Sequence, residues 1–269
     1  MDSAAAADLA RSGITVEQAE SAGFYSVDDA RECYSEFQPV RALVLPYYDP
    51  WSGDLLTFDR GAGPEDFARV RYLAEPPATR GFKPAKPQRY GQPQRSGVHP
   101  FFPMVDGLDW AAVLADPKVP LCITEGEKKA LRATLAGVPT IGLGGVYNFL
   151  SDGELLETLA RIVWKGREVR ICYDSDAATN PDIMAAEGRL AAELSLKRGA
   201  SVFLARIPES ADGRKIGIDD LIVEQGEEAF HAVLAAAERM RKIDSAVLGL
   251  NEHVAWIERD GKVLDLATG

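Results

Sequence analysis

From Pro117 onward, short apolar runs alternate with longer amphipathic segments, and this alternation limits the possible folds more than any other feature. We predict four strands, in the segments VPLCIT, VPTIGL, REVRICYD and SVFLARIP. We predict helices over residues 127–137, 151–166 and 181–198, and a last helical stretch over 219–240, in one piece or in two around Gly226. Such alternation favours a mostly parallel sheet with helices on both faces, so the expected class is α/β.

Acidic residues follow three of the predicted strands, at the end where each strand stops. Glu125 follows LCIT, Asp174 and Asp176 follow RICY, and Asp219 and Asp220 come after the fourth strand and a loop. Because ligands of parallel sheets bind at the carboxyl ends of the strands, we expect these carboxylates to converge. Each one taken singly could instead cap the next helix.

Carboxylates that share one site repel each other unless a divalent cation neutralises them. An all-oxygen set without Cys or His favours Mg²⁺ or Mn²⁺ over zinc. Asp174 and Asp176 are two residues apart at the end of a strand, so their side chains can project to the same side and share a metal. The sequence therefore predicts a divalent metal site.

Four segments, LCITEGEKKALRA, IGLGGVYNF, ICYDSDAATNPDIMAAEGRLA and KIGIDDLI, resemble the TOPRIM domain of DnaG-type primases, phage primase-helicases, topoisomerases and related nucleases. The likeness is closest to primases, and among these to phage and plasmid replication proteins. It covers about 110 residues well and the preceding 80 or so loosely. It implies a TOPRIM fold, which is Rossmann-like, with a mostly parallel four-stranded sheet, helices on both faces and a smaller α+β lobe before it.

The resemblance also implies roles for the acidic residues. Glu125 corresponds to a metal ligand or general acid/base, Asp174 and Asp176 to the pair that holds Mg²⁺, and Asp219 and Asp220 to a secondary role at a second metal. These primases usually carry an aspartate four residues after the motif glutamate.

In this chain Lys129 occupies that place, which leaves the binding of a second metal open. Lys128 and Lys129 either contact a phosphate or are merely solvated on the first turns of their helix.

The formal net charge of −11 argues against a protein that coats nucleic acid through overall positive potential. The stretch over residues 80–95, RGFKPAKPQRYGQPQR, has five basic residues and no acidic one. In the resembling primases a basic groove for the template and nucleotides lies at this place in the chain. The corresponding residues are Arg69, Arg71, Lys83, Lys86, Arg89 and Tyr90. A flexible, solvated loop is the alternative for this stretch.

We expect four parts, namely an N-terminal helical segment (1–36), an α+β lobe with the basic loop (37–118), a TOPRIM catalytic domain (119–240) and an appendage or the start of a further domain (241–269). No apolar run approaches the roughly 20 residues of a membrane span, and the chain does not begin with a signal-peptide pattern. We therefore expect no membrane partner and a cytoplasmic location.

The first functional hypothesis is a DNA primase core that makes short primers on single-stranded DNA from NTPs or dNTPs, by Mg²⁺-dependent nucleotidyl transfer in phage- or plasmid-type replication. No Walker motif occurs in the sequence, so a helicase partner, or a helicase domain in a longer protein, would supply ATP-driven motion. A TOPRIM metal-dependent nuclease and a non-catalytic DNA-binding module are the alternatives.

Overall fold

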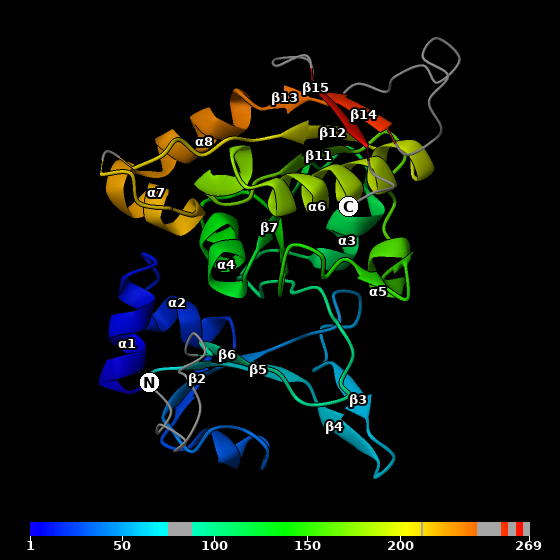
Figure 1. The fold of residues 1–269 in the computed structure, drawn as a ribbon. Coiled ribbons are helices and arrows are strands. Elements are labelled where there is room, and N and C mark those ends of the chain that lie inside the picture. Colours follow the sequence, from blue (N-terminus) through cyan, green and yellow to red (C-terminus); the bar gives the residue numbers. More distant parts are fainter. Residues whose placement is uncertain (75–87, 211, 241–253, 258–261, 266–269) are drawn as a thin grey trace, which may run out of the picture. The chain divides into compact units, whose positions relative to one another are not determined.

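The computed structural model describes residues 1–74, 88–210, 212–240, 254–257 and 262–265. The chain divides into two compact units, and each is described by itself (Figure 1). The first unit comprises Met1–Gly97 and Met104–Leu108, and the second comprises Val98–Pro103 and the chain from Asp109 onward. The expected division at residues 36, 118 and 240 stays a prediction.

The first unit contains helices and a four-stranded antiparallel sheet with the strand order β1-β2-β5-β6. A separate hairpin pairs β3 with β4. The bounds are α1 (Ser3–Ala10), α2 (Val16–Ser21), β1 (Tyr25–Val27), η1 (Ala30–Glu32), β2 (Ala42–Pro46), β3 (Thr57–Asp59), β4 (Pro64–Asp66), β5 (Ala68–Tyr72) and β6 (Tyr90–Gly91).

Every residue of β2 is buried, whereas β5 alternates between buried and half-buried positions. This difference follows from the sequence, because ALVLP is apolar throughout and ARVRY places an arginine at every second position. The two arginines of β5, Arg69 and Arg71, therefore lie on the same face of the sheet.

The second unit contains a five-stranded sheet with the order β13-β12-β11-β7-β8. Four strands are parallel, and β13 pairs with β12 in the antiparallel sense at the edge. The bounds are β7 (Leu121–Glu125), β8 (Thr140–Leu143), β11 (Glu168–Ile171), β12 (Ser201–Leu204) and β13 (Glu238–Arg239). The four predicted strands are all present, and the α/β class is confirmed in this coarser sense.

The edge strand β13 corrects the predicted helix over residues 219–240. That segment forms α7 (Ile218–Gln225) and α8 (Glu227–Ala235), separated at Gly226, whose φ of +87° suits glycine. Beyond α8 the chain extends, and the Met240 N–H donates to Val202 O. The edge of the sheet thus offers hydrogen-bond partners to the backbone after α8. The chain pairs with β12 there instead of forming a further helical turn.

The helix predicted over residues 151–166 is wrong. A hairpin of β9 (Leu150–Ser151) and β10 (Glu154–Leu155) occupies its first part, followed by the four-residue helix α5 (Glu157–Ala160). Asp152 and Gly153 form the turn, both with positive φ (51° and 83°). A turn with two positive φ angles is the type I′ geometry that Asp-Gly favours, so this dipeptide outweighed the helical spacing.

Further helices and strands belong to the second unit. Among them are α3 (Trp110–Ala115) and α4 (Glu127–Leu135), and α6 (Pro181–Ala192) continues into a π-helical turn at Glu193–Lys197. The last strands, β14 (Val254–Ile257) and β15 (Lys262–Asp265), form a separate antiparallel pair. None of the helices that the structure describes is long and apolar enough to cross a membrane.

The strand order fixes where the chain reverses direction across the sheet. From β7, helix α4 leads outward to β8, whereas from β11, helix α6 leads the opposite way to β12. Because parallel crossovers are right-handed, the two helices lie on opposite faces. The neighbours β7 and β11 therefore flank the switch point, where open α/β sheets leave a crevice at the carboxyl ends of the strands.

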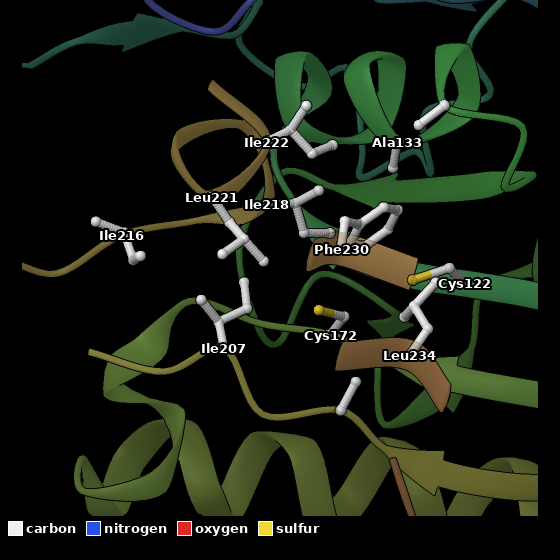
Figure 2. Close-up of a cluster of buried hydrophobic side chains, with 12 residues drawn as sticks. Cys122, Ala133, Cys172, Ile207, Ile216, Ile218, Leu221, Ile222, Phe230 and Leu234 are labelled. Carbon is white, nitrogen blue, oxygen red and sulfur yellow. The ribbon is translucent and has the colours of Figure 1, made fainter. Parts of the chain in front are cut away.

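A buried cluster forms the core on the face covered by α4, α7 and α8. Figure 2 shows apolar side chains from the strands and these helices pointing toward one another, with the thiol groups of Cys122 and Cys172 among them. Both cysteines are fully buried, and burial raises the pKa of the Cys122 thiol to about 12. Both cysteines therefore act as small apolar groups.

Candidate acidic centre at the switch point of the sheet

Glu125 and Asp174 lie at the carboxyl ends of the two strands that flank the switch point. Glu125 is the last residue of β7, and Asp174 follows β11 by three residues. The two strands are in parallel register, with Ile123 opposite Ile171, and the Cys172 N–H continues the ladder to Ile123 O. The predicted convergence of these two carboxylates therefore follows from the strand pairing itself.

Asp176 lies in η2 (Ser175–Ala178), the short 3-10 helix that begins after Asp174. The loop before α7 is held against this turn, because the Ser175 N–H donates to Ile216 O (2.9 Å) and the Ile216 N–H donates to Ser175 Oγ (3.1 Å). The hydrogen bonds of Ser175 thus hold residues 215–217 next to the turn that carries Asp174 and Asp176.

Two lysines contact the carboxylates of this turn. Lys129, in the first turns of α4, donates to Asp174 Oδ1, and its side chain is only 21% exposed. Lys215 Nζ lies 3.1 Å from Asp174 Oδ2 and 3.0 Å from Asp176 Oδ2, and its side chain is 47% exposed. Both oxygens of Asp174 are therefore paired with ammonium groups.

Neighbouring charges shift the pKa values of Glu125 and Lys129. Burial raises the pKa of Glu125, the Lys129 charge opposes that rise, and the Asp174 charge adds to it. Burial alone would lower the pKa of Lys129, but Asp174, Asp219 and Glu125 together raise it. Glu125 is consequently a carboxylate that holds a proton more strongly than a solvated one, beside a lysine that stays charged.

Asp219 and Asp220 occupy the first turn of α7 and differ in their surroundings. Asp219 is buried, and its Oδ1 atom lies near Gly217, which also neighbours Lys129 and Asp174. Asp220 Oδ2 accepts from the Gly217 N–H (3.0 Å), so this side chain caps the helix. The structure brings Asp219 to the centre, whereas Asp220 takes the capping role that the sequence left open.

The fit of a divalent ion to this centre depends on Asp176 and on the two lysines. Asp176 Oδ1 is buried and has no hydrogen-bond partner among the described residues, which is the situation of a carboxylate prepared to bind a cation. Lys215 is half exposed and could give way to such an ion. On the other side of Asp174, Lys129 fills the space, and no group of three His, Cys, Asp or Glu side chains in the described parts could hold a metal as it stands.

The sequence interpretation missed Lys215 and Gly217. A Cβ atom added at Gly217 would meet Lys129 Cε at 2.7 Å and Asp174 Oδ1 at 2.9 Å. The φ of Gly217 is −104°, so the glycine is needed for space and not for its backbone conformation. Both residues lie in the segment KIGIDDLI, where only the aspartates were considered.

Lys128 is buried on α4, with 8% of its surface exposed, so a freely solvated side chain is excluded for it. The proposed phosphate contact of Lys128 stays a prediction. For Lys129 the structure gives Asp174 as a partner, which the sequence interpretation did not consider.

Two of the predicted basic residues, Arg69 and Arg71, lie beside one aromatic ring in the first unit. The guanidinium carbons of Arg69 and Arg71 lie 5.4 and 5.3 Å from the centre of the Tyr90 ring, which β6 places beside β5. Arg71 Nε also donates to Asp8 (2.7 Å), a buried carboxylate of α1. Arg69, Tyr90 and Arg71 therefore form a fixed cationic and aromatic group, with Arg71 tied to the core of its unit.

The other predicted basic residues are placed differently. Arg89 is exposed immediately before β6. Lys83 and Lys86 lie outside the described residues. The acidic centre lies in the second unit and the cationic group in the first, and the nucleic-acid role of these basic residues stays a prediction.

Comparison with known protein families and sequences gives a partial match. The model of a family described as a domain of unknown function (DUF3854) matches residues 109–229, which include the acidic centre. An uncharacterized protein of Picosynechococcus sp. is 33% identical over 141 residues, which are 48% of this chain and 14% of the relative. This chain thus spans about one seventh of that relative's length.

Comparison with solved structures identifies bacterial primases as neighbours. The zinc-binding and RNA polymerase domains of the Aquifex aeolicus primase align with a TM-score of 0.57 at 16% identity, covering 88% of this chain and 57% of that one. The RNA polymerase domain of Mycobacterium tuberculosis primase DnaG aligns with a TM-score of 0.49 at 16% identity, covering 87% and 76%. The Aquifex likeness shows that the fold is primase-like, and this chain spans just over half of that structure.

Proposed function

We propose that this chain is the catalytic core of a TOPRIM-type primase, which joins NTPs or dNTPs into short primers on a single-stranded DNA template. The observation that carries the proposal is the position of Glu125 and Asp174 at adjacent strand ends of the switch point, in a chain with a primase-like fold. Phosphoryl and nucleotidyl transfer depends mainly on positioning and on neutralising charge, and this centre is equipped for both.

Each side chain of the centre has its own role in the proposed reaction. One Mg²⁺ or Mn²⁺ ion, held by Asp174 and Asp176, would neutralise the charge of the incoming triphosphate. Glu125, whose pKa is raised by burial, accepts the proton of the attacking 3′-hydroxyl group. Lys215 lies at the same carboxylates and is exposed enough to move to a phosphate oxygen when an ion takes its place.

The first unit supplies the contacts to the template. Arg69 and Arg71 carry the charge that phosphates require, and Tyr90 offers an aromatic face to a base. The exposed Arg89 extends this positive surface. Lys83 and Lys86, from the same basic stretch of sequence, belong to this template-binding role in the proposal.

The proposed setting is phage- or plasmid-type replication, in which a primer is needed wherever a helicase opens the duplex. The proposal includes a helicase partner, or a helicase domain in a longer protein. Its support is the resemblance of the four sequence segments around Glu125, Asp174 and Asp219 to primases that precede helicases.

The test is to incubate the purified chain with single-stranded DNA, labelled NTPs or dNTPs, and Mg²⁺ or Mn²⁺, and to resolve the products by length. We expect new oligonucleotides from the wild-type chain and at least a hundredfold less product from Glu125→Gln. The matched control is Glu154→Gln, an exposed glutamate of the β9–β10 hairpin, which should synthesise normally.

Other products would replace the proposal with one of its alternatives. A shortened template without synthesis, lost in Glu125→Gln, would establish a nuclease that uses the same carboxylates. Binding of single-stranded DNA with neither product, in both metals and with both nucleotide types, would establish a non-catalytic DNA-binding module.

A further inference from the structure

The two lysines at Asp174 are not equivalent. The Lys129 side chain is 21% exposed and reaches Asp174 from helix α4, whereas Lys215 is 47% exposed and comes from the loop before α7. Lys215 bridges Asp174 and Asp176, which are the two predicted metal ligands. An ion between these two carboxylates would therefore displace Lys215 and leave Lys129 where it is.

Lys129 is enclosed on several sides. The backbone of Gly217 lies close to its side chain, since a Cβ atom there would come within 2.7 Å of Lys129 Cε. Asp219 and Glu125 contribute attraction in addition to Asp174. Because Lys129 is paired with the buried Asp174 and lies against the backbone of Gly217, its departure would leave a buried carboxylate without this cation.

The charges of the centre show what remains to be neutralised. Glu125, Asp174, Asp176 and Asp219 are four acidic side chains, and the Lys129 ammonium group is paired with one of them, Asp174. The unmet demand lies on the side of Asp176, whose Oδ1 atom is buried and without a hydrogen-bond partner in the described structure.

We propose that the Lys129 ammonium group permanently occupies one of the two cation positions among these carboxylates, so that the centre binds one divalent ion and not two. The ion binds between Asp174 and Asp176 in place of Lys215. The inference rests on the metal-dependent centre of the proposed function and specifies its composition: one exchangeable divalent cation and one built-in monovalent cation.

The stoichiometry of Mn²⁺ binding tests this directly. The full chain is titrated with Mn²⁺, the free ion is followed by electron paramagnetic resonance, and the heat of binding is measured in parallel. We expect one Mn²⁺ per wild-type chain and two per chain in Lys129→Asp, where the built-in cation is replaced by a further ligand. Lys118→Asp makes the same charge change at an exposed position before β7 and should keep one ion.

A second variant covers the case in which Lys129→Asp does not fold, as judged by circular dichroism. Lys129→Met keeps the length of the side chain and removes its charge, so the single Mn²⁺ should bind at least threefold more tightly. Two ions bound by the wild-type chain, no ion bound, a stoichiometry of one in folded Lys129→Asp, or an unchanged affinity in Lys129→Met would each overturn the inference.

The outcome is separable from that of the primase assay. One bound Mn²⁺ without primer synthesis would count against the proposed function and leave the composition of the centre standing. Primer synthesis together with two bound Mn²⁺ ions would uphold the function and overturn the built-in cation.

Discussion

Gly217 lies so close to Lys129 that a Cβ atom at residue 217 would be 2.7 Å from Lys129 Cε, nearer than two carbon atoms can approach. The lysine beside Asp174 and the glycine that covers it therefore depend on each other. Residues 129 and 217 are far apart in sequence, and the hydrogen bonds between Ser175 and Ile216 hold the segment of Gly217 in place.

We expect Gly217→Ala to fold, because its backbone conformation suits alanine, but to lose about 1–3 kcal/mol of stability through overpacking. Lys129 must move away from Asp174, so primer synthesis should fall at least tenfold. Denaturant unfolding and the primer assay measure the two effects. Gly145→Ala is the control, since its added Cβ would meet Asn148 only at ordinary contact distance (3.5 Å). Equal behaviour of the two variants would contradict the dependence of Lys129 on Gly217.

Lys215→Met should strengthen the binding of a divalent ion. In the structure Lys215 competes for the oxygens of Asp174 and Asp176, so its removal eliminates a competing cation and leaves uncompensated negative charge. We expect the Mn²⁺ dissociation constant to fall at least threefold in a calorimetric titration. Lys165→Met, at an exposed position before β11, should not change it. Weaker binding in Lys215→Met would show that the lysine helps to hold the ion instead of competing with it.

Tyr90→Ala should weaken binding of single-stranded DNA by about 1–3 kcal/mol, which is the usual contribution of one base stacked on an aromatic side chain. The loss should be similar at low and high salt, because the ring carries no charge, whereas Arg69→Ala should reduce the salt dependence itself. Fluorescence anisotropy with a labelled oligonucleotide measures both. Tyr25→Ala, which removes an exposed tyrosine of the same unit, should bind normally. If Tyr90→Ala binds as tightly as the control, the template surface lies elsewhere.

Arg206→Met should destabilise the second unit by about 3–5 kcal/mol. Arg206 donates two hydrogen bonds of 2.6 Å to Glu187, whose side chain is 2% exposed on α6, so the substitution leaves a buried carboxylate without its cation. Burial raises the pKa of Glu187, and the Arg206 charge and hydrogen bonds lower it. Without Arg206 the pKa should therefore rise further. Denaturant unfolding measures the loss, and Arg239→Met, at an exposed edge position, should cost less than about 0.5 kcal/mol.

Several elements could be read from the sequence because they depend on local spacing and on strand ends. The four parallel strands have apolar runs bounded by turn residues; Glu125 ends one of them, and Asp174 follows another by three residues. The β9–β10 hairpin could have been found from Asp152 and Gly153, but the helical spacing of the residues after them received more weight. β13 could not have been found, because its two residues become a strand only by pairing with β12.

By itself, the sequence determined the α/β class and the position of the carboxylates at strand ends, since both follow from apolar periodicity along the chain. The tertiary structure alone decided which cations those carboxylates meet. Lys129 reaches Asp174 across 45 residues, and Lys215 reaches it from the loop beyond β12. Such contacts depend on the order of the strands in the sheet and on the face to which each crossover helix turns. A local sequence pattern does not encode the distance between residues that are far apart in the chain.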